Sequence, residues 1–272
     1  MTHTSRSPIL RPWQIGMKTI GVLGGLGPQA TMDFEARVHT VSRKLIPARR
    51  SGGYPPMLVY YYRFPPFLLG EDETPLLPLQ PDSRLLDAAR NMAQWANFLV
   101  ITANAPHVFR AELADAFAGP VLSIVDVTLD EVRRRNPSRI GVLGLGDTRV
   151  YTGPLRHQNI STVTLPADLQ GPLDTAVFSM MEGSNGLGER EAALAAVDWM
   201  RAQSVDAILL GCTELPLLVE MAAEAPDIIN PAQFLAEAAV RYAISEVAVL
   251  NQENSTAYRE PMRVPQPVPA DR

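Results

Sequence analysis

Five residues, Ile20-Gly21-Val22-Leu23-Gly24, occur a second time in the chain as Ile140-Gly141-Val142-Leu143-Gly144. Each copy is a short aliphatic run that leads into a glycine-rich turn, which is typical of a buried strand followed by a tight loop. Both halves also contain a later aliphatic run that ends in a small polar turn, at residues 97–101 and 206–210. The repeat therefore predicts two similar units built in the same order.

Strand and helix patterns alternate along the chain, and this order favours parallel sheets with right-handed crossovers. We expect an α/β fold of two pseudo-symmetric three-layer αβα domains. The active site is expected in the cleft between them, because ligands bind beyond the carboxyl ends of parallel strands. The first domain is predicted to cover residues 17–118 and 229–250, and the second to cover residues 119–228. The expected strands are residues 19–23, 56–62, 97–101, 139–143, 161–165 and 206–210, and the expected helices are residues 30–41, 83–95 and 189–203.

Three segments are expected to lie outside regular structure. Residues 1–16 are polar and read as a loose leader. Residues 64–81 are proline-rich and apolar, which is typical of a lid or a binding loop. Residues 251–272 are polar and proline-rich, and we expect them to be disordered or draped on a partner subunit.

The composition argues against several classes of function. A formal net charge of −5 at pH 7 gives no electrostatic reason to expect nucleic acid as a partner. No apolar run is long enough to cross a membrane, and the first residues lack the apolar core of a signal peptide. The single cysteine rules out an internal disulfide framework. We therefore expect a soluble, cytoplasmic protein.

No metal and no cofactor is expected. The four histidines are scattered without metal-ligand spacing, and neither Lys18 nor Lys44 lies where a pyridoxal phosphate lysine belongs. The run Gly25-Leu26-Gly27-Pro28-Gln29-Ala30 fits a dinucleotide-binding pattern, but no acidic residue ends the second strand. We predict instead that Gly25 and Gly27 form a nest of backbone N–H groups for a small carboxylate. A glycine turn without a ligand is the alternative.

Cys212 lies in the turn Gly211-Cys212-Thr213-Glu214, between a predicted strand and a helical segment. A thiol that faces a helix amino terminus can ionise near pH 7, although a lone cysteine is most often a small buried apolar residue. The first half has a matching turn, in which Ala103 occupies the place of Cys212 and Asn104 the place of Thr213. The chain thus has two similar turns, of which one carries a thiol.

The polar residues around these turns each allow two interpretations. Asn104 and Thr213 can be helix N-caps, or they can hold a substrate carboxylate. His107 can carry a proton or make a plain polar contact, and Glu214 can simply stabilise a helix dipole. Arg63 follows the second predicted strand, where it can bind an anion or lie on the solvated surface.

Taken together, these motifs resemble the aspartate/glutamate racemase family, whose members need no cofactor. The family's amino-terminal signature is matched by Gly24-Gly25-Leu26-Gly27-Pro28-Gln29-Ala30-Thr31. Its carboxyl-terminal Gly-Cys-Thr-Glu motif is intact at residues 211–214, and its middle motif corresponds to Ala103-Asn104-Ala105-Pro106-His107. The likeness covers roughly residues 17–250.

The sequence departs from the family pattern at two places. The resemblance implies two cysteines that face each other across the substrate α-carbon, but Ala103 stands in the first position and cannot carry a proton. The family's aspartate racemases also hold the distal carboxylate with an arginine, whose place here falls near the apolar Leu68-Leu69. Racemisation of an acidic amino acid by two thiols is therefore not expected.

The resemblance implies an amino-acid or related carboxylate racemase or isomerase in which Cys212 acts on one face and Thr102, His107 or a water on the other. The first alternative is an arylmalonate-type decarboxylase, whose single thiol protonates an enediolate held by hydroxyl and backbone donors. The second is a non-catalytic carboxylate binder. The partner implied is a small carboxylate, and the relatives imply a homodimer. The predicted site comprises Cys212 and His107 as catalytic residues, with Gly25, Gly27, Arg63, Thr31, Thr102, Ala103, Asn104, Ala105, Gly211, Thr213 and Glu214 around the substrate.

Overall fold

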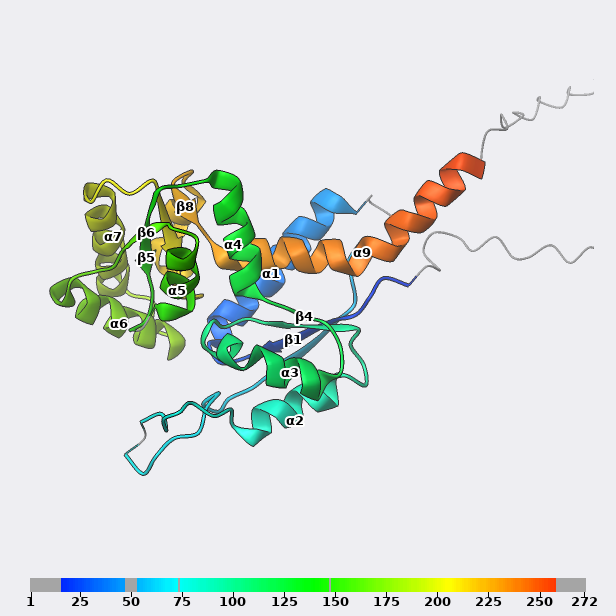
Figure 1. Ribbon diagram of the computed structural model, residues 1–272, viewed down its shortest axis with the longest axis horizontal. Coiled ribbons are helices and arrows are strands. Elements are labelled where there is room, and N and C mark those ends of the chain that lie inside the picture. Colours follow the sequence, from blue (N-terminus) through cyan, green and yellow to red (C-terminus); the bar gives the residue numbers. More distant parts are fainter. Residues whose placement is uncertain (1–15, 47–52, 73, 147, 258–272) are drawn as a thin grey trace, which may run out of the picture.

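The computed structural model describes residues 16–46, 53–72, 74–146 and 148–257. This part of the chain contains two four-stranded parallel sheets, one in each half (Figure 1). The first has the order β2-β1-β3-β4 and the second the order β6-β5-β7-β8, so the two halves repeat the same topology. The strands are β1 (Ile20–Gly24), β2 (Met57–Tyr61), β3 (Phe98–Ile101), β4 (Val121–Leu122), β5 (Arg139–Leu143), β6 (Ser161–Val163), β7 (Ala207–Leu210) and β8 (Ile228–Ile229). The predicted α/β fold of two parallel-sheet domains is confirmed.

Alternate residues of each strand in the first domain face opposite helix layers, as the two-residue period of a strand requires. Ile20 and Val22 pack into the core with α1 (Pro28–Leu45) and α9 (Pro231–Ala257). Leu23 and its neighbours in β3 pack on the other side with α2 (Ser83–Met92) and α3 (Arg110–Phe117). The first sheet is therefore covered on both faces, and its strands are apolar throughout because a parallel sheet is buried on both sides.

The second domain repeats this layering. Ile140 and Leu209 face α4 (Ile124–Arg135) and α5 (Arg149–His157). Ile208 and Leu210 face α6 (Ala167–Met181) and α7 (Leu187–Ala202). Shorter helical segments connect the layers: η1 (Ala105–Phe109), α8 (Leu215–Val219) and η2 (Glu220–Glu224).

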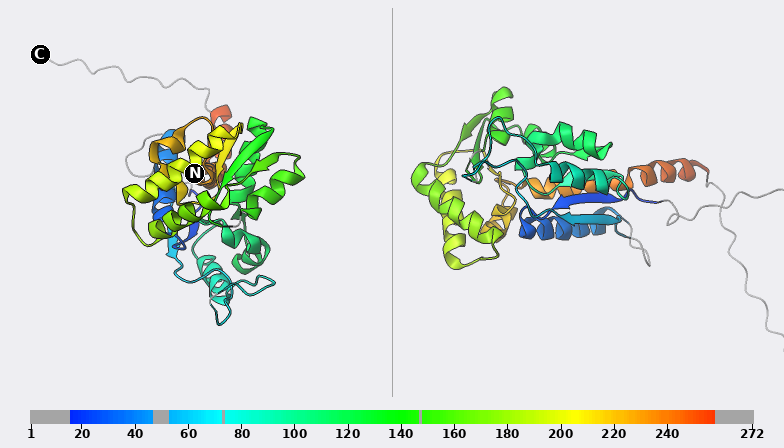
Figure 2. Two further views of the ribbon diagram at one scale, coloured as in Figure 1. Left: turned by 90° about the vertical axis from the view of Figure 1, so that its left-hand side faces the viewer. Right: turned by 90° about the horizontal axis from the view of Figure 1, so that it is seen from below.

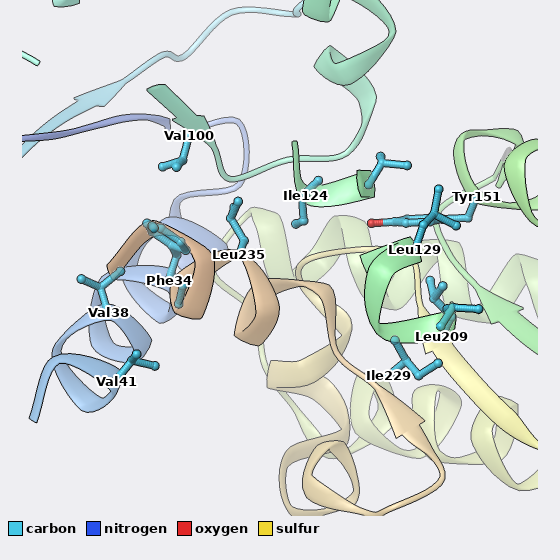
Figure 3. Packing of buried hydrophobic residues seen from close by; sticks show 14 of the residues in the cluster. Phe34, Val38, Val41, Val100, Ile124, Leu129, Tyr151, Leu209, Ile229 and Leu235 are labelled. Atoms are coloured by element: carbon cyan, nitrogen blue, oxygen red, sulfur yellow. The ribbon is translucent and has the colours of Figure 1, made fainter. Parts of the chain in front are cut away.

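One apolar core continues from the first domain into the second. It runs from Phe34 on α1 and Val100 on β3, through Ile124 at the start of α4, to Tyr151 and Leu209 in the second domain (Figure 3). The helices α4 and α9 pack against each other in the middle of the molecule, between the two sheets (Figures 1 and 2). The two domains are thus fixed to each other by side-chain packing as well as by the chain that connects them.

Several element boundaries differ from the sequence-based expectation. The first sheet includes β4, which lies beyond the predicted domain boundary at residue 118. The last helix, α9, continues to Ala257, past the predicted start of a disordered tail at residue 251. The leader residues 1–15 and the tail residues 258–272 lie outside the described residues. No helix in the described part of the chain combines the length and apolar character needed to cross a lipid bilayer.

The segment after β2 is a projecting, strand-like arm at the lower left of Figure 1. Its two limbs are joined by backbone hydrogen bonds, with Leu68 N donating to Gln80 O at 3.0 Å and Leu76 N donating to Leu68 O at 3.0 Å. Apolar side chains along this arm are exposed, and Leu77 is 83% exposed. The arm leaves the first sheet at the carboxyl end of β2, the same edge at which the predicted site residues lie.

Candidate functional site

The turns at the carboxyl ends of β3 and β7 lie against each other, although they belong to different domains. Asn104 Nδ2 donates a hydrogen bond to the backbone oxygen of Gly211 at 2.8 Å. This bond joins residues that are 107 positions apart in the chain. It places Ala103, which precedes Asn104, and Cys212, which follows Gly211, in adjoining turns. The structure therefore brings together the two turns that the internal repeat pairs.

Cys212 is a buried thiol that is hydrogen-bonded to a carboxylate. Its side chain is 8% exposed and belongs to the apolar cluster of the second domain. The Sγ atom donates to Glu214 Oε2 at 3.0 Å, and Thr213 Oγ1 donates to the same oxygen at 3.1 Å. Burial raises the pKa of the Cys212 thiol well above its usual value, and the charge of Glu214 raises it further.

This shift is opposite to the one expected from a helix amino terminus. The helix that follows Cys212, α8, spans only Leu215–Val219, so its dipole is small. Desolvation and a neighbouring carboxylate both favour the protonated thiol, and they outweigh that dipole. The expectation that Cys212 ionises near pH 7 is therefore wrong for the molecule in this conformation.

Glu214 connects the cysteine turn to the glycine loop. Its side chain is buried, and burial raises the pKa of its carboxyl group. One carboxylate oxygen binds Cys212, and the other lies against Gly27, where an added Cβ would come within 1.7 Å of Glu214 Oε1. Glycine at position 27 is therefore required for this carboxylate to reach its place. Glu214 does more than stabilise a helix dipole, because it binds the thiol directly.

Two threonine hydroxyls hold the glycine loop. Gly25 N donates to Thr31 Oγ1 at 2.8 Å, and Thr31 Oγ1 lies 2.9 Å from Thr102 Oγ1. Thr31 Oγ1 also donates to Gly27 O at 3.1 Å. Both hydroxyls are buried, and Thr102 immediately precedes Ala103. The glycine loop and the turn after β3 are thus tied together within the first domain.

His107 uses both of its ring nitrogens to bind the backbone. Ile124 N–H donates to Nε2 at 3.2 Å, so Nε2 carries no proton, and Nδ1 lies 2.9 Å from the oxygen of Ala103. A carbonyl oxygen only accepts hydrogen bonds, so Nδ1 is the protonated nitrogen. Burial lowers the pKa of His107 to about 4. This is the geometry of a neutral histidine that joins the Ala103 turn to the start of α4, with no nitrogen free to carry a proton.

Arg63 lies at the open side of the glycine loop. Its side chain is exposed, and its Nη1 donates to the backbone oxygen of Gly25 at 3.2 Å. Nearby Arg84 differs, because it binds Asp82 through its Nη2 at 2.6 Å and stacks 4.0 Å from the centre of the Phe64 ring. The one partner recorded for Arg63 in the described part of the chain is a neutral carbonyl, which leaves the charge of its guanidinium without a carboxylate.

Tyr151 completes the site and was not predicted from the sequence. It is fully buried, and its hydroxyl donates to Asn104 Oδ1 at 2.8 Å, from the second domain to the first. The internal sequence repeat does contain a signal for Tyr151. Tyr151 lies seven residues after Gly144, as Thr31 lies seven residues after Gly24, so the two residues occupy equivalent positions.

The remaining predicted residues are small. Ala103 is partly buried, whereas Ala105 is exposed at the start of η1. Among the described residues, no cluster of three or more histidine, cysteine, aspartate or glutamate side chains has the arrangement of a metal site.

The protonation state of His107 leads to a pH-dependent stability. The unfolded histidine has a pKa near 6.5, and burial lowers the pKa in the folded protein to about 4. Between these pH values the unfolded chain binds a proton that the folded chain does not. The free energy of unfolding is therefore at its full value above about pH 6.5 and decreases as the pH falls towards 4. We expect urea unfolding to show a loss of up to about 3 kcal/mol over this range.

The matched variants isolate this contribution. His107→Gln keeps a donor and an acceptor but does not titrate, so its unfolding free energy should change less between pH 7 and pH 4.5 than that of the unsubstituted protein. His157→Gln replaces an exposed histidine and should follow the unsubstituted protein. An equal pH dependence in all three proteins would contradict a buried neutral His107.

Comparisons with known proteins agree with the fold and the motifs. A family model described as Asp/Glu/Hydantoin racemase matches residues 23–239. The broad specificity amino-acid racemase RacX of Bacillus subtilis (strain 168) is 23% identical over 225 residues, which cover 81% of this chain and 96% of RacX. The aspartate racemase of Picrophilus torridus superposes with a TM-score of 0.69 at 21% identity, covering 83% of this chain and 94% of that one.

A crystal structure of a putative Asp/Glu racemase from Yersinia pestis superposes with a TM-score of 0.64 at 19% identity, over 84% of this chain and all of that one. At this level of identity the two solved structures show a common fold, and the family match rests on the sequence model. That match spans both glycine loops, the Ala103 turn and the Cys212 turn. The chain therefore belongs to the Asp/Glu/hydantoin racemase family.

Proposed function

We propose that this protein is a cofactor-independent racemase or isomerase of an amino acid or a related carboxylate, in which Cys212 is the acid–base group. The observation that carries the proposal is the 3.0 Å hydrogen bond from Cys212 Sγ to Glu214 Oε2, located where the turns of the two domains meet. A buried thiol with a carboxylate partner can both accept and return a proton. The relative RacX, by its name a broad specificity amino-acid racemase, supports an amino acid as the substrate.

The proposed proton transfer begins with the pair in its observed state, a thiol that donates to a carboxylate. Glu214 takes the thiol proton, and the resulting Cys212 thiolate removes the proton from the substrate α-carbon. The electron pair of the broken C–H bond moves into the substrate carboxylate to give an enediolate. Return of the proton to the same face regenerates the substrate. Protonation of the opposite face by a water inverts it, and the hydroxide left behind takes the proton held by Glu214. Burial raises the pKa values of both groups, so a proton shared between them spares the site a second charge.

We propose that the substrate carboxylate is held at the glycine loop. Arg63 supports this role, because its guanidinium lies on the loop and its recorded partner there is the neutral oxygen of Gly25. The other residues proposed to surround the substrate come from the loop and the two turns, where the Gly25 N–H and the Thr31 and Thr213 hydroxyls already donate within the protein. The set comprises Gly25, Gly27, Gly211, Thr31, Thr102, Asn104 and Thr213, with Ala103 and Ala105 as small neighbours. His107 is proposed to position the Ala103 turn, because both of its nitrogens bind backbone groups.

A second candidate function follows from Ala103. A methyl group stands where the resemblance implies the second thiol, so the described site offers one thiol in its two turns. A decarboxylase of the arylmalonate type needs only one, since loss of CO₂ itself generates the enediolate and Cys212 then protonates one face. The carboxylate-binding groups would be the same, and a proton from water, passed through Glu214, would restore the thiol after each turnover.

We also propose a homodimer located in the cytoplasm. The exposed apolar side chains of the projecting arm, among them Leu77, support a partner surface, and sedimentation velocity measures whether it is used. The free thiol of Cys212 supports a reducing compartment.

The Cys212–Glu214 pair predicts how alkylation of the thiol depends on pH. Since Cys212 is the only cysteine, iodoacetamide labelling followed by mass spectrometry reports this one group. Glu214→Gln removes a negative charge beside the thiol, so the rise of the labelling rate should move to lower pH. Glu191→Gln, on the exposed face of α7, is the matched control and should label as the unsubstituted protein does. A rise at unchanged or higher pH in Glu214→Gln would contradict the pair.

Reactions in D₂O with a panel of amino acids and aryl malonates distinguish the candidate functions. A racemase incorporates deuterium at the α-carbon with inversion, whereas a decarboxylase releases CO₂ in proportion to substrate consumed. In either case Cys212→Ser should lower the rate by at least about 10²-fold, because a serine hydroxyl is a far weaker acid. Binding without exchange or CO₂ release would favour the non-catalytic carboxylate binder and overturn the proposed enzyme.

Ala103→Cys tests the missing second thiol. If the turns face each other across the substrate, the new thiol supplies a proton to the second face, and inversion should increase relative to exchange with retention. Circular dichroism establishes that the variant is folded. A folded variant that inverts none of the panel compounds faster than the unsubstituted protein would show that the turns do not face each other in this way, or that the substrate class is wrong.

A further inference from the structure

Tyr151 and Asn104 form a closed set of contacts with the cysteine turn. The Tyr151 hydroxyl donates to Asn104 Oδ1 at 2.8 Å, and Asn104 Nδ2 donates to Gly211 O at 2.8 Å. The Tyr151 ring lies directly beside Gly211, where an added Cβ would be 3.4 Å from its Cδ2 atom. Each of the three residues therefore contacts the other two, and the set spans the boundary between the domains.

The hydrogen bonds of the Asn104 amide fix its orientation. The backbone oxygen of Gly211 only accepts, so the amide nitrogen must face it. The amide oxygen then faces Tyr151, whose hydroxyl must be the donor. The alternative orientation would set two oxygens against each other at Gly211. Gly211 O thus determines which way the amide points, and the Tyr151 hydroxyl holds it there by donating to Oδ1.

We infer that Tyr151 is a positioning residue that acts through Asn104 to set the spacing between the Ala103 turn and the Cys212 turn. Tyr151 is fully buried in the continuous core, which fixes its ring, and its hydroxyl oxygen points towards Ile124 at the start of α4 (Figure 3). A hydroxyl on so rigid a support gives Asn104 one allowed position. This inference deepens the proposed function, on which its catalytic consequence rests.

In this arrangement one hydrogen of the Asn104 amide nitrogen remains available to a ligand. An Nδ2 group carries two hydrogens, and one of them binds Gly211 O. Among the described residues, the second hydrogen of this nitrogen has no acceptor. Asn104 can therefore hold the two turns together and donate to an oxygen of a carboxylate or an enediolate at the same time. Tyr151 keeps both hydrogens of that amide in place.

The position of Tyr151 in the repeat explains why it has this role. Its equivalent, Thr31, binds Thr102 within the first domain. Gly211 is the equivalent of Thr102, because each immediately precedes the aligned positions 103 and 212. Glycine offers no hydroxyl for a short side chain to bind, and it leaves room for a larger ring. The longer tyrosine therefore passes Gly211 and reaches Asn104 of the other domain.

The test uses the single thiol as a reporter of the turn geometry, which needs no substrate. Tyr151→Phe removes the hydroxyl and leaves Asn104 Oδ1 without a donor, so the amide loses one of the two bonds that hold it and the cross-domain bond weakens. We expect iodoacetamide to label Cys212 about tenfold faster or more at each pH, because the turns open more often. The pH at which the rate rises should stay unchanged, since Glu214 still binds the thiol.

Two controls separate positioning from a general loss of stability. Tyr62→Phe removes another buried tyrosine hydroxyl, whose partner is Pro65 O at 3.2 Å, and it should leave the labelling rate unchanged. Asn104→Ala should raise the rate by itself, and adding Tyr151→Phe to it should produce no further increase, because Tyr151 acts through Asn104. Asn104→Asp keeps Tyr151 but lacks the amide donor, so it should also label faster, and it tests the inference if Tyr151→Phe does not fold.

The outcomes are decisive in both directions. A folded Tyr151→Phe that labels at the original rate overturns the inference, and so does an effect of Tyr151→Phe that persists in full without Asn104. A protein that shows no exchange and no CO₂ release, yet shows the expected labelling, would refute the proposed function and leave the positioning role standing. Where exchange is measured, Tyr151→Phe should lower its rate, whereas Tyr62→Phe should not.

Discussion

The hydrogen bond between Asn104 Nδ2 and Gly211 O is the contact on which the site depends, because it is made between two domains that otherwise have separate sheets. It joins the turn at the end of β3 directly to the turn at the end of β7, whereas the Tyr151–Asn104 bond and the apolar core link the turn after β3 to other parts of the second domain. A core of aliphatic side chains specifies which elements lie together, but directional bonds fix two loops relative to each other more closely. The position of Cys212 relative to Ala103 is set by this amide.

A second constraint comes from the glycine loop. Gly27 has no side chain, and Glu214 occupies the space that a Cβ would take. The same carboxylate accepts the hydrogen bond of the Cys212 thiol. A motif in the first domain therefore determines the electrostatics of a residue in the second. The loop at residues 24–27 and the turn at residues 211–214 are therefore in direct contact through Glu214.

Local patterns were enough to predict the two similar domains and all the longer strands, whereas the two-residue strands β4 and β8 were missed. The repeat beginning at Ile20 and Ile140 predicted two units built in the same order, and the structure confirms it. The helix α9 continues further than expected, since its polar carboxyl-terminal residues carry no apolar signal, although no proline interrupts them before Ala257. Protonation states could not be predicted from local sequence patterns. The high pKa of Cys212 and the low pKa of His107 both result from burial, which depends on segments distant in the sequence.

Tyr151 shows how a duplicated fold can acquire an asymmetric site. Thr31 and Tyr151 occupy equivalent positions, and so do Ala103 and Cys212 in the two turns. Matching positions of the two domains therefore carry side chains of different chemistry. In the first domain, short hydroxyls bond to each other and stabilise the loop that is proposed to hold the carboxylate. In the second, the long tyrosine and the thiol–carboxylate pair reach the domain boundary. In the proposed function, anion binding is thus assigned mainly to the first domain and proton transfer to the second. Such a division suits a reaction in which one fixed acid–base group acts on a substrate that the opposite domain holds in place.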